Sequence, residues 1–159
     1  NDRPEVLERL LFHPHMLPGF NDSGAHLINL AFFDGNLLTL QVAQRQSLER
    51  VAHAVRRLTR EPAEFFGIDA GRLDIGSRAD VVLIDPDTLR SYDTDANRRM
   101  VYREVLGHEQ LVNRSDGVVT AVFIAGEPVW DGREFAPALG TRRLGRPLTA
   151  GSQAAARVA

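Results

Sequence analysis

Apolar residues in the first half of the chain recur at the spacing of helices. The pattern predicts a helix that opens near Asp2 and is ended by Pro14, because proline disfavours the helical conformation of the residue before it. A second apolar stretch, residues 27–44, is mostly helical with a break at residues 34–36. Ser47 is then a suitable cap for a third helix.

Proline and glycine divide the end of this helical region. Pro62 breaks the third helix and can open a short one over residues 63–66, which Gly67 closes as a C-terminal glycine. Between the first two helical stretches, residues 16–21 form an apolar run that predicts a buried strand. A turn of small residues follows this strand and contains Asp22.

Continuous apolar runs in the second half of the chain predict strands. Residues 79–86 are β-branched and uninterrupted, which is typical of a central strand buried on both faces. Residues 118–124 are the strongest strand, and a tight turn returns the chain as a hairpin at residues 129–130. The polar stretch between these runs contains one expected short strand, residues 100–105. Helices followed by strands suggest two layers or two part-domains that meet near residues 67–71.

Composition excludes several classes of protein. Apolar residues make up 43% and charged residues 25% of the 159 residues, as in an ordinary globular domain. A net charge of -2 gives no field that favours nucleic acid or an anionic membrane, and no apolar run approaches the ~20 residues that span a bilayer. The chain has no Cys for disulfides and no Lys for a carbamylated metal bridge. Because the chain shows no signal-peptide pattern we expect a cytoplasmic protein. Because it begins at Asn1 we expect a processed or truncated product, or an excised part of something longer.

Asp22 is the leading candidate for chemistry, since it follows an apolar strand, where barrels and open sheets place their sites. A carboxylate there can bind a metal, accept a proton from a metal-bound water, or cap the next helix. His26 could hydrogen-bond a substrate or only begin that helix. His13 and His15 have the spacing of two metal ligands on a strand, although Pro14 separates them and both could be surface residues. A self-contained metal site of these two histidines with Asp22 is a further alternative.

Three parts of the chain resemble the amidohydrolase superfamily and, within it, the N-acyl-D-amino-acid deacylases (D-aminoacylases). Residues 21–26, Asn-Asp-Ser-Gly-Ala-His, resemble the family motif Ser-Asp-Ala-Gly-Ala-His. The runs at residues 47–68 and 71–86 resemble its C-terminal part, and residues 122–132 resemble its closing hairpin. The resemblance extends over about residues 1–135.

The resemblance implies an α/β fold, which as a fragment is mixed α+β. Residues 1–67 would be the C-terminal end of a (β/α)8 barrel, with residues 16–21 as its eighth strand, followed by helices. Residues 68–135 would be the C-terminal part of a composite β-sandwich, and residues 136–159 an irregular tail.

The resemblance also implies a metal-dependent hydrolase of linear C–N amide bonds, with small N-acylated amino acids as substrates. Asp22 would be general base and then acid on a zinc-bound water, and could also be a metal ligand. Ser23, Gly24 and His26 would contact the substrate. The family's first-strand His-x-His, its bridging residue and its two later His ligands have no match here, and Asn21 replaces the usual Ser. We therefore expect the isolated chain to be inactive and not to retain zinc.

Other functions stay open at the level of sequence. The chain could be a non-catalytic β-rich assembly module or a degenerate fragment that has kept family sequence, or part of an enzyme acting on cyclic amides. One barrel strand and its helices would expose strand edges and apolar faces. We therefore expect the missing part of the barrel, or a second copy of the chain, to cover them.

Overall fold

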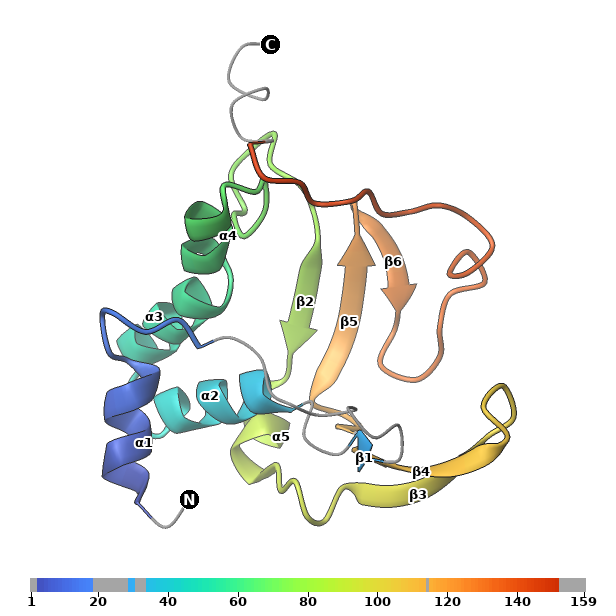
Figure 1. Cartoon of the computed structure of the whole chain (residues 1–159), viewed down its shortest axis with the longest axis horizontal. Coiled ribbons are helices and arrows are strands. Elements are labelled where there is room, and N and C mark those ends of the chain that lie inside the picture. Colours follow the sequence, from blue (N-terminus) through green and yellow to red (C-terminus); the bar gives the residue numbers. More distant parts are fainter. Residues whose placement is uncertain (1–2, 19–28, 31–33, 114, 152–159) are drawn as a thin grey trace.

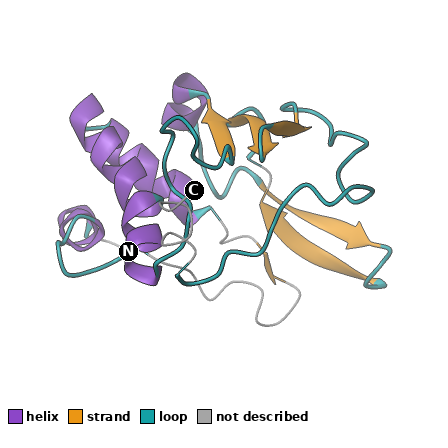
Figure 2. Cartoon of the chain, turned by 90° about the horizontal axis from the view of Figure 1, so that it is seen from above, coloured by secondary structure: helices purple, strands orange, loops and turns teal. Residues whose placement is uncertain are grey.

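The computed structural model describes residues 3–18, 29–30, 34–113 and 115–151 of the chain. Its helices gather on one side of the molecule and its strands on the other (Figures 1 and 2). The helices are α1 (Pro4–Leu11), α2 (Gly35–Gln44), α3 (Leu48–Leu58), α4 (Arg60–Phe66) and α5 (Pro86–Ser91). The strands are β1 (Asn29–Leu30), β2 (Val81–Ile84), β3 (Arg98–Arg103), β4 (His108–Asn113), β5 (Val119–Ile124) and β6 (Glu127–Trp130). None of the described helices combines the length and the apolar character that crossing a bilayer requires.

The described strands form two sheets of three strands each. One has the order β1-β4-β3, in which β1 runs parallel to β4 and β3 runs antiparallel to it. The other has the order β2-β5-β6 and is antiparallel throughout. The β3–β4 hairpin projects away from the helices (Figure 1). The mixed α+β character agrees with the expectation for a fragment.

Local rules explain most helix ends. The side chain of Ser47 accepts a hydrogen bond from the backbone N–H of Arg50 at 3.1 Å, which confirms the predicted cap of α3. Gly67 has φ 64 and closes α4 as predicted, because glycine adopts the left-handed conformation without steric cost. The break between α3 and α4 falls at Thr59, earlier than predicted, and Pro62 lies in the first turn of α4, where its missing N–H breaks no helical hydrogen bond.

The core lies where α2, α3 and α5 meet the start of β5. The apolar pattern of residues 27–44 predicts a set of core residues, namely Phe32, Phe33, Leu37, Leu38 and Leu40. Leu37 and Leu38 of α2 are half-buried and pack against the core, in agreement with this prediction. Two other predicted core residues, Phe32 and Phe33, lie outside the described residues. The buried residues of the core are Leu40, Ala43, Ala54, Leu89, Tyr92 and Val118.

The prediction of a central, doubly buried strand at residues 79–86 is wrong. In the described part of the chain β2 pairs only with β5 and is an edge strand. Val82 is 53% exposed and Leu83 is 48% exposed. A β-branched run indicates a surface suited to burial, but it does not determine which elements pack against that surface.

The buried strand predicted at residues 16–21 is also not observed where it can be checked. Residues 16–18 have no regular structure, and Met16 is 44% exposed. A parallel strand needs hydrogen-bonding neighbours, and residues 16–18 pair with none of the described strands. Residues 19–21 lie outside the described part.

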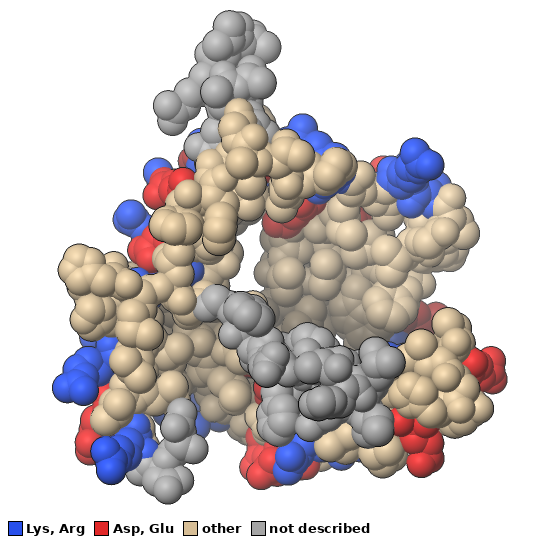
Figure 3. Space-filling model, in the orientation of Figure 1, with Lys and Arg blue, Asp and Glu red and all other residues tan. Residues whose placement is uncertain are grey.

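A groove separates the helices from the β2-β5-β6 sheet, and Figure 3 shows the molecule hollowed at this position. Its volume is about 450 Å³. Most of its lining is apolar and comes from α2, α3 and β2, including Leu40, Val51, Val55, Val82 and Ile84.

Gln41 joins α2 to the segment that contains α5. Its side chain is 6% exposed, and its Nε2 donates to the backbone oxygens of Leu89 at 3.0 Å and Tyr92 at 2.7 Å. Its Oε1 accepts from Arg45 at 3.1 Å. The side-chain amide of Gln41 thus bonds to two backbone carbonyl groups at the C-terminal end of α5.

We predict that Gln41→Leu lowers the free energy of unfolding by about 1–3 kcal/mol, because it leaves the backbone oxygen of Tyr92 without the donor that Gln41 supplies. Gln46→Leu is the matched control, since Gln46 is exposed and bonds only to Arg50 at the surface, and it should change stability by less than about 0.5 kcal/mol. Urea unfolding followed by circular dichroism measures both variants. Equal losses in the two would contradict the role given to Gln41.

Gly71 provides a second stability test. It has φ +75, and a Cβ added there would lie 2.6 Å from the backbone carbon and oxygen of Thr59. Gly76 has φ +83 but nothing within 4 Å of the same position. Gly76→Ala should therefore cost about 1–2 kcal/mol from backbone conformation alone. Gly71→Ala should cost at least about 3 kcal/mol, because the α3–α4 junction must also move. Thermal or urea unfolding of the two variants checks this order, and a larger loss for Gly76→Ala would refute it.

Candidate functional site

The residues predicted for catalysis and substrate contact fall together in one short segment. Asp22, Ser23, Gly24 and His26 all lie outside the residues that the structure describes. Their predicted roles are therefore untested. The described residues on either side of residues 19–28 show how the rest of the protein holds the two ends of this segment.

Arg57 of α3 holds the chain before the segment. Its side chain is 3% exposed, and its Nε donates to the backbone oxygen of Leu11 at 2.7 Å. Its Nη2 donates to the backbone oxygens of His13, at 3.0 Å, and of Met16. Its Nη1 pairs with Glu61 at 3.2 Å. The irregular stretch after α1 is thus fixed to α3 by one buried cation whose charge Glu61 balances.

β1 holds the chain after the segment. Asn29 and Leu30 pair in parallel with Leu111 and Val112 of β4. The β3–β4 hairpin is therefore attached to the backbone a few residues beyond the predicted motif.

Asp34 strengthens this second attachment. It is 7% exposed at the start of α2, and its Oδ2 accepts three hydrogen bonds. The donors are the hydroxyl of Tyr92 at 2.9 Å, the hydroxyl of Thr94 at 2.6 Å and the amide of Asn113 at 3.0 Å. Burial raises the pKa of Tyr92 above its usual range, and the hydrogen bond and negative charge of Asp34 raise it further. Tyr92 therefore remains a protonated donor, and the cluster is suited to holding the backbone in place.

No pattern in the sequence marks Arg57, Asp34, Tyr92 or Thr94 as parts of these attachments. Arg57 lies in a run of basic residues, but it is three positions after Ala54 and thus shares the buried face of α3. Asp34 was interpreted only as part of a helix break. The partners of Asp34 lie about sixty to eighty residues away along the chain, which no local pattern can indicate.

The described residues do not provide a metal site. His13 Nδ1 accepts a hydrogen bond from the backbone N–H of His15 at 3.2 Å, and the two rings lie 5.7 Å apart. Within the described ranges no group of three or more His, Cys, Asp or Glu could hold a metal ion. The alternative site that adds Asp22 to the two histidines stays untested, because Asp22 is not described.

Comparison with known proteins identifies relatives that align with most of this chain. Uncharacterized proteins of Mycobacterium bovis and of two Mycobacterium tuberculosis strains are each 40% identical to this chain over 141 residues. The aligned part covers 85% of this chain but 23% of each relative, so the chain spans about a quarter of the length of the curated relatives it matches. No solved structure matches the chain.

A family model provides the assignment. The model described as "Amidohydrolase family" matches residues 20–129, which is well over half of the chain. The match takes in the predicted motif, both sheets and all helices except α1. The chain belongs to the amidohydrolase family.

Proposed function

We propose that this chain is the C-terminal portion of a metal-dependent amidohydrolase that cleaves linear amide C–N bonds. Small N-acyl-D-amino acids are the proposed substrates, Asp22 is the proposed general base and acid, and Ser23, Gly24 and His26 are proposed to contact the substrate. The observation that carries the proposal is the family match, which begins two residues before Asp22 and includes the motif at residues 21–26. The narrower substrate class rests on the resemblance of residues 47–86 and 122–132 to the D-aminoacylases.

The contacts of Arg57 on one side, and of Asp34 and β1 on the other, support the proposed role of residues 19–28 in catalysis. A residue that transfers protons must lie within hydrogen-bond reach of its partners, so its backbone has to be held in place. Arg57 fixes residues 11–16 to α3, while Asp34 and the β1–β4 pairing fix the chain from residue 29 onward. Both ends of the segment that carries Asp22 are therefore attached to the folded body.

In the proposed reaction, Asp22 takes a proton from the attacking water and returns it to the leaving nitrogen. A bound zinc ion would make that water acidic near neutral pH and would polarise the amide carbonyl. The described residues offer no cluster that fits such an ion. The metal ligands are accordingly proposed to lie in another part of a longer protein. Only that longer protein is then expected to retain zinc.

The exposed surfaces agree with this assignment. The open edge of β2 and the apolar groove beside α3 are the kinds of surface that proteins usually cover. We propose that the remainder of the barrel covers them in a longer protein, and that a second copy does so when this chain is alone.

We predict that Asp22→Asn, in a longer gene product that contains this segment, lowers kcat for N-acetyl-D-amino acids by about 10²–10⁴-fold, because general acid–base catalysis is lost. Bound zinc, measured by mass spectrometry, should change little if Asp22 acts mainly on protons. Asp87→Asn is the matched control, since the side chain of Asp87 is 85% exposed and, among the described residues, pairs with Arg90 alone; it should leave kcat unchanged. An Asp22→Asn enzyme within a fewfold of the wild type would refute the role of Asp22.

We also predict that the 159-residue chain alone does not hydrolyse N-acetyl-D-amino acids, with or without added zinc. The reason is that the family's His ligands have no counterpart in its sequence. Release of free amino acid is the measurement. Zinc-dependent activity of this chain would show that it holds a metal by itself, and would contradict the division of the site proposed above.

A further inference from the structure

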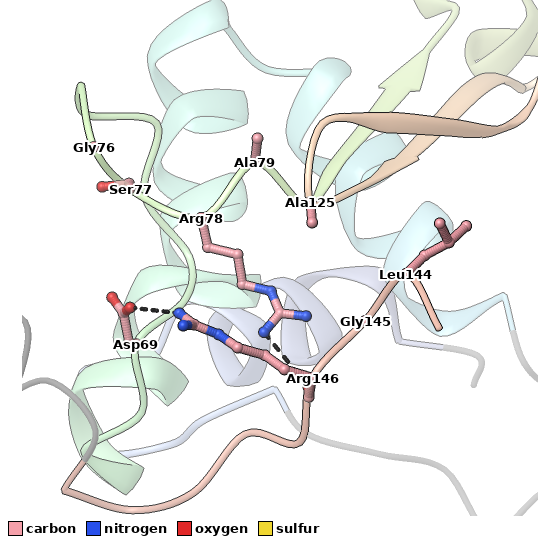
Figure 4. A pocket seen from close by; sticks show the side chains of 9 residues that line it. All are labelled: Asp69, Gly76, Ser77, Arg78, Ala79, Ala125, Leu144, Gly145 and Arg146. Carbon is pink, nitrogen blue, oxygen red and sulfur yellow. Dashed lines mark hydrogen bonds and ion pairs between the residues drawn. The ribbon is translucent and has the colours of Figure 1, made fainter. Parts of the chain in front are cut away.

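A polar pocket lies beside the β2-β5-β6 sheet, where the C-terminal segment passes the loop before β2 (Figures 1 and 4). Its volume is about 380 Å³. It is bounded by the loop before β2, by the turn between β5 and β6, and by residues 144–146. Two of its lining residues, Arg78 and Arg146, are cations.

Arg78 is a buried cation with unused hydrogen-bond donors. Its side chain is 8% exposed, and its Nε pairs with Asp80. Its Nη1 donates a long hydrogen bond of 3.4 Å to the backbone oxygen of Arg146. Among the described residues no acceptor bonds to its Nη2. Arg78 Nη2 is not one of the buried side-chain atoms that lack a partner in the described part of the chain, so it keeps access to solvent and can bond to an added acceptor.

The pocket brings two ion-paired arginines together. Asp69 is shared by two arginines, with Arg146 Nη2 at 2.9 Å and Arg72 Nη2 at 3.1 Å. Asp80 pairs with Arg78. The two guanidinium groups that line the pocket, those of Arg78 and Arg146, are thus each held by a carboxylate. Figure 4 shows Arg78 reaching toward the backbone of Arg146 while Arg146 reaches back to Asp69.

Gly145 leaves space beside the unused donor. A Cβ built at Gly145 would lie 3.8 Å from Arg78 Nη2 and 3.7 Å from Ile124 Cγ2. These are ordinary contacts, so a methyl-sized group fits here without displacing its neighbours. In the protein as it stands, no side chain of residue 145 covers this side of Arg78.

We propose that this pocket binds a small oxyanion, a phosphate or a carboxylate group, between Arg78 and Arg146. Guanidinium groups present paired N–H donors that match the oxygens of both anions, and such charge-assisted hydrogen bonds are the stronger ones in proteins. The anion accepts a hydrogen bond from Arg78 Nη2. The proposal concerns a ligand site in the C-terminal part of the chain and does not depend on the proposed hydrolase function.

Titration calorimetry of the 159-residue chain tests the proposal, with inorganic phosphate and acetate as separate probes in chloride buffer of constant ionic strength. We expect saturable binding of one anion per chain, with a dissociation constant on the order of 1 mM. The anion that binds more tightly identifies the group that the pocket prefers. Failure of both probes to saturate would overturn the proposal.

Three variants locate the binding. Arg78→Gln should weaken it by at least about tenfold, because it removes a charged donor. Arg78→Gln also removes the ion-pair partner of Asp80. Gly145→Asp provides a second test, because it leaves the ion pair between Arg78 and Asp80 in place. It places a carboxylate beside Arg78, and should abolish anion binding and raise the Tm. Arg143→Gln makes the same charge change in an exposed residue outside the pocket, and should bind like the wild type.

Two results would assign the binding to general surface charge and contradict the proposal. One is an equal loss of affinity in Arg143→Gln and Arg78→Gln. The other is wild-type affinity in a folded Gly145→Asp protein.

Discussion

Backbone carbonyl groups outside helices and strands need donors, and in this protein two helices supply them from buried side chains. Gln41 of α2 donates to the chain around α5, and Arg57 of α3 donates to the chain after α1. Both side chains lie on helix faces that apolar residues would otherwise occupy. Each is acceptable there because its polar atoms are paired, and Arg57 also has Glu61 to balance its charge. These contacts fix two irregular stretches to the same pair of helices.

Sequence patterns predicted the features that depend on near neighbours. The cap at Ser47 and the end of α4 at Gly67 each involve contacts within a few residues, and so does the tight turn before β6, where Ala125 and Gly126 both have positive φ. β4 was not predicted, because it is a polar strand that is held by β3 and β1 instead of by an apolar pattern of its own. The Asp34 cluster was missed for a related reason, since its members meet only in the folded chain.

The incorrect prediction for the environment of β2 has a physical cause. Apolar, β-branched runs report that a surface is suited to burial, but they do not report which part of a protein covers it. Among the described residues β2 has one neighbouring strand, although its run has the composition of a doubly covered strand. This chain spans about a quarter of the length of its mycobacterial relatives. A surplus of apolar surface on such a segment is what a fold completed by further chain would leave.

The candidate site could be predicted only in part, because a motif identifies a residue but not the structure that positions it. Asp22 was identified from the motif at residues 21–26, whereas Arg57 and Asp34 emerged only from the fold. These two attachments are not independent of each other. Arg57 lies on α3, Asp34 begins α2, and the two helices pack through Ala43 and Ala54, which are both 0% exposed. A close-packed pair of this kind moves little, so the chain enters and leaves the segment around Asp22 at two points of one rigid unit. The segment around Asp22 is therefore held through this helix pair at its first end, and through Asp34 and the β1–β4 pairing at its second end.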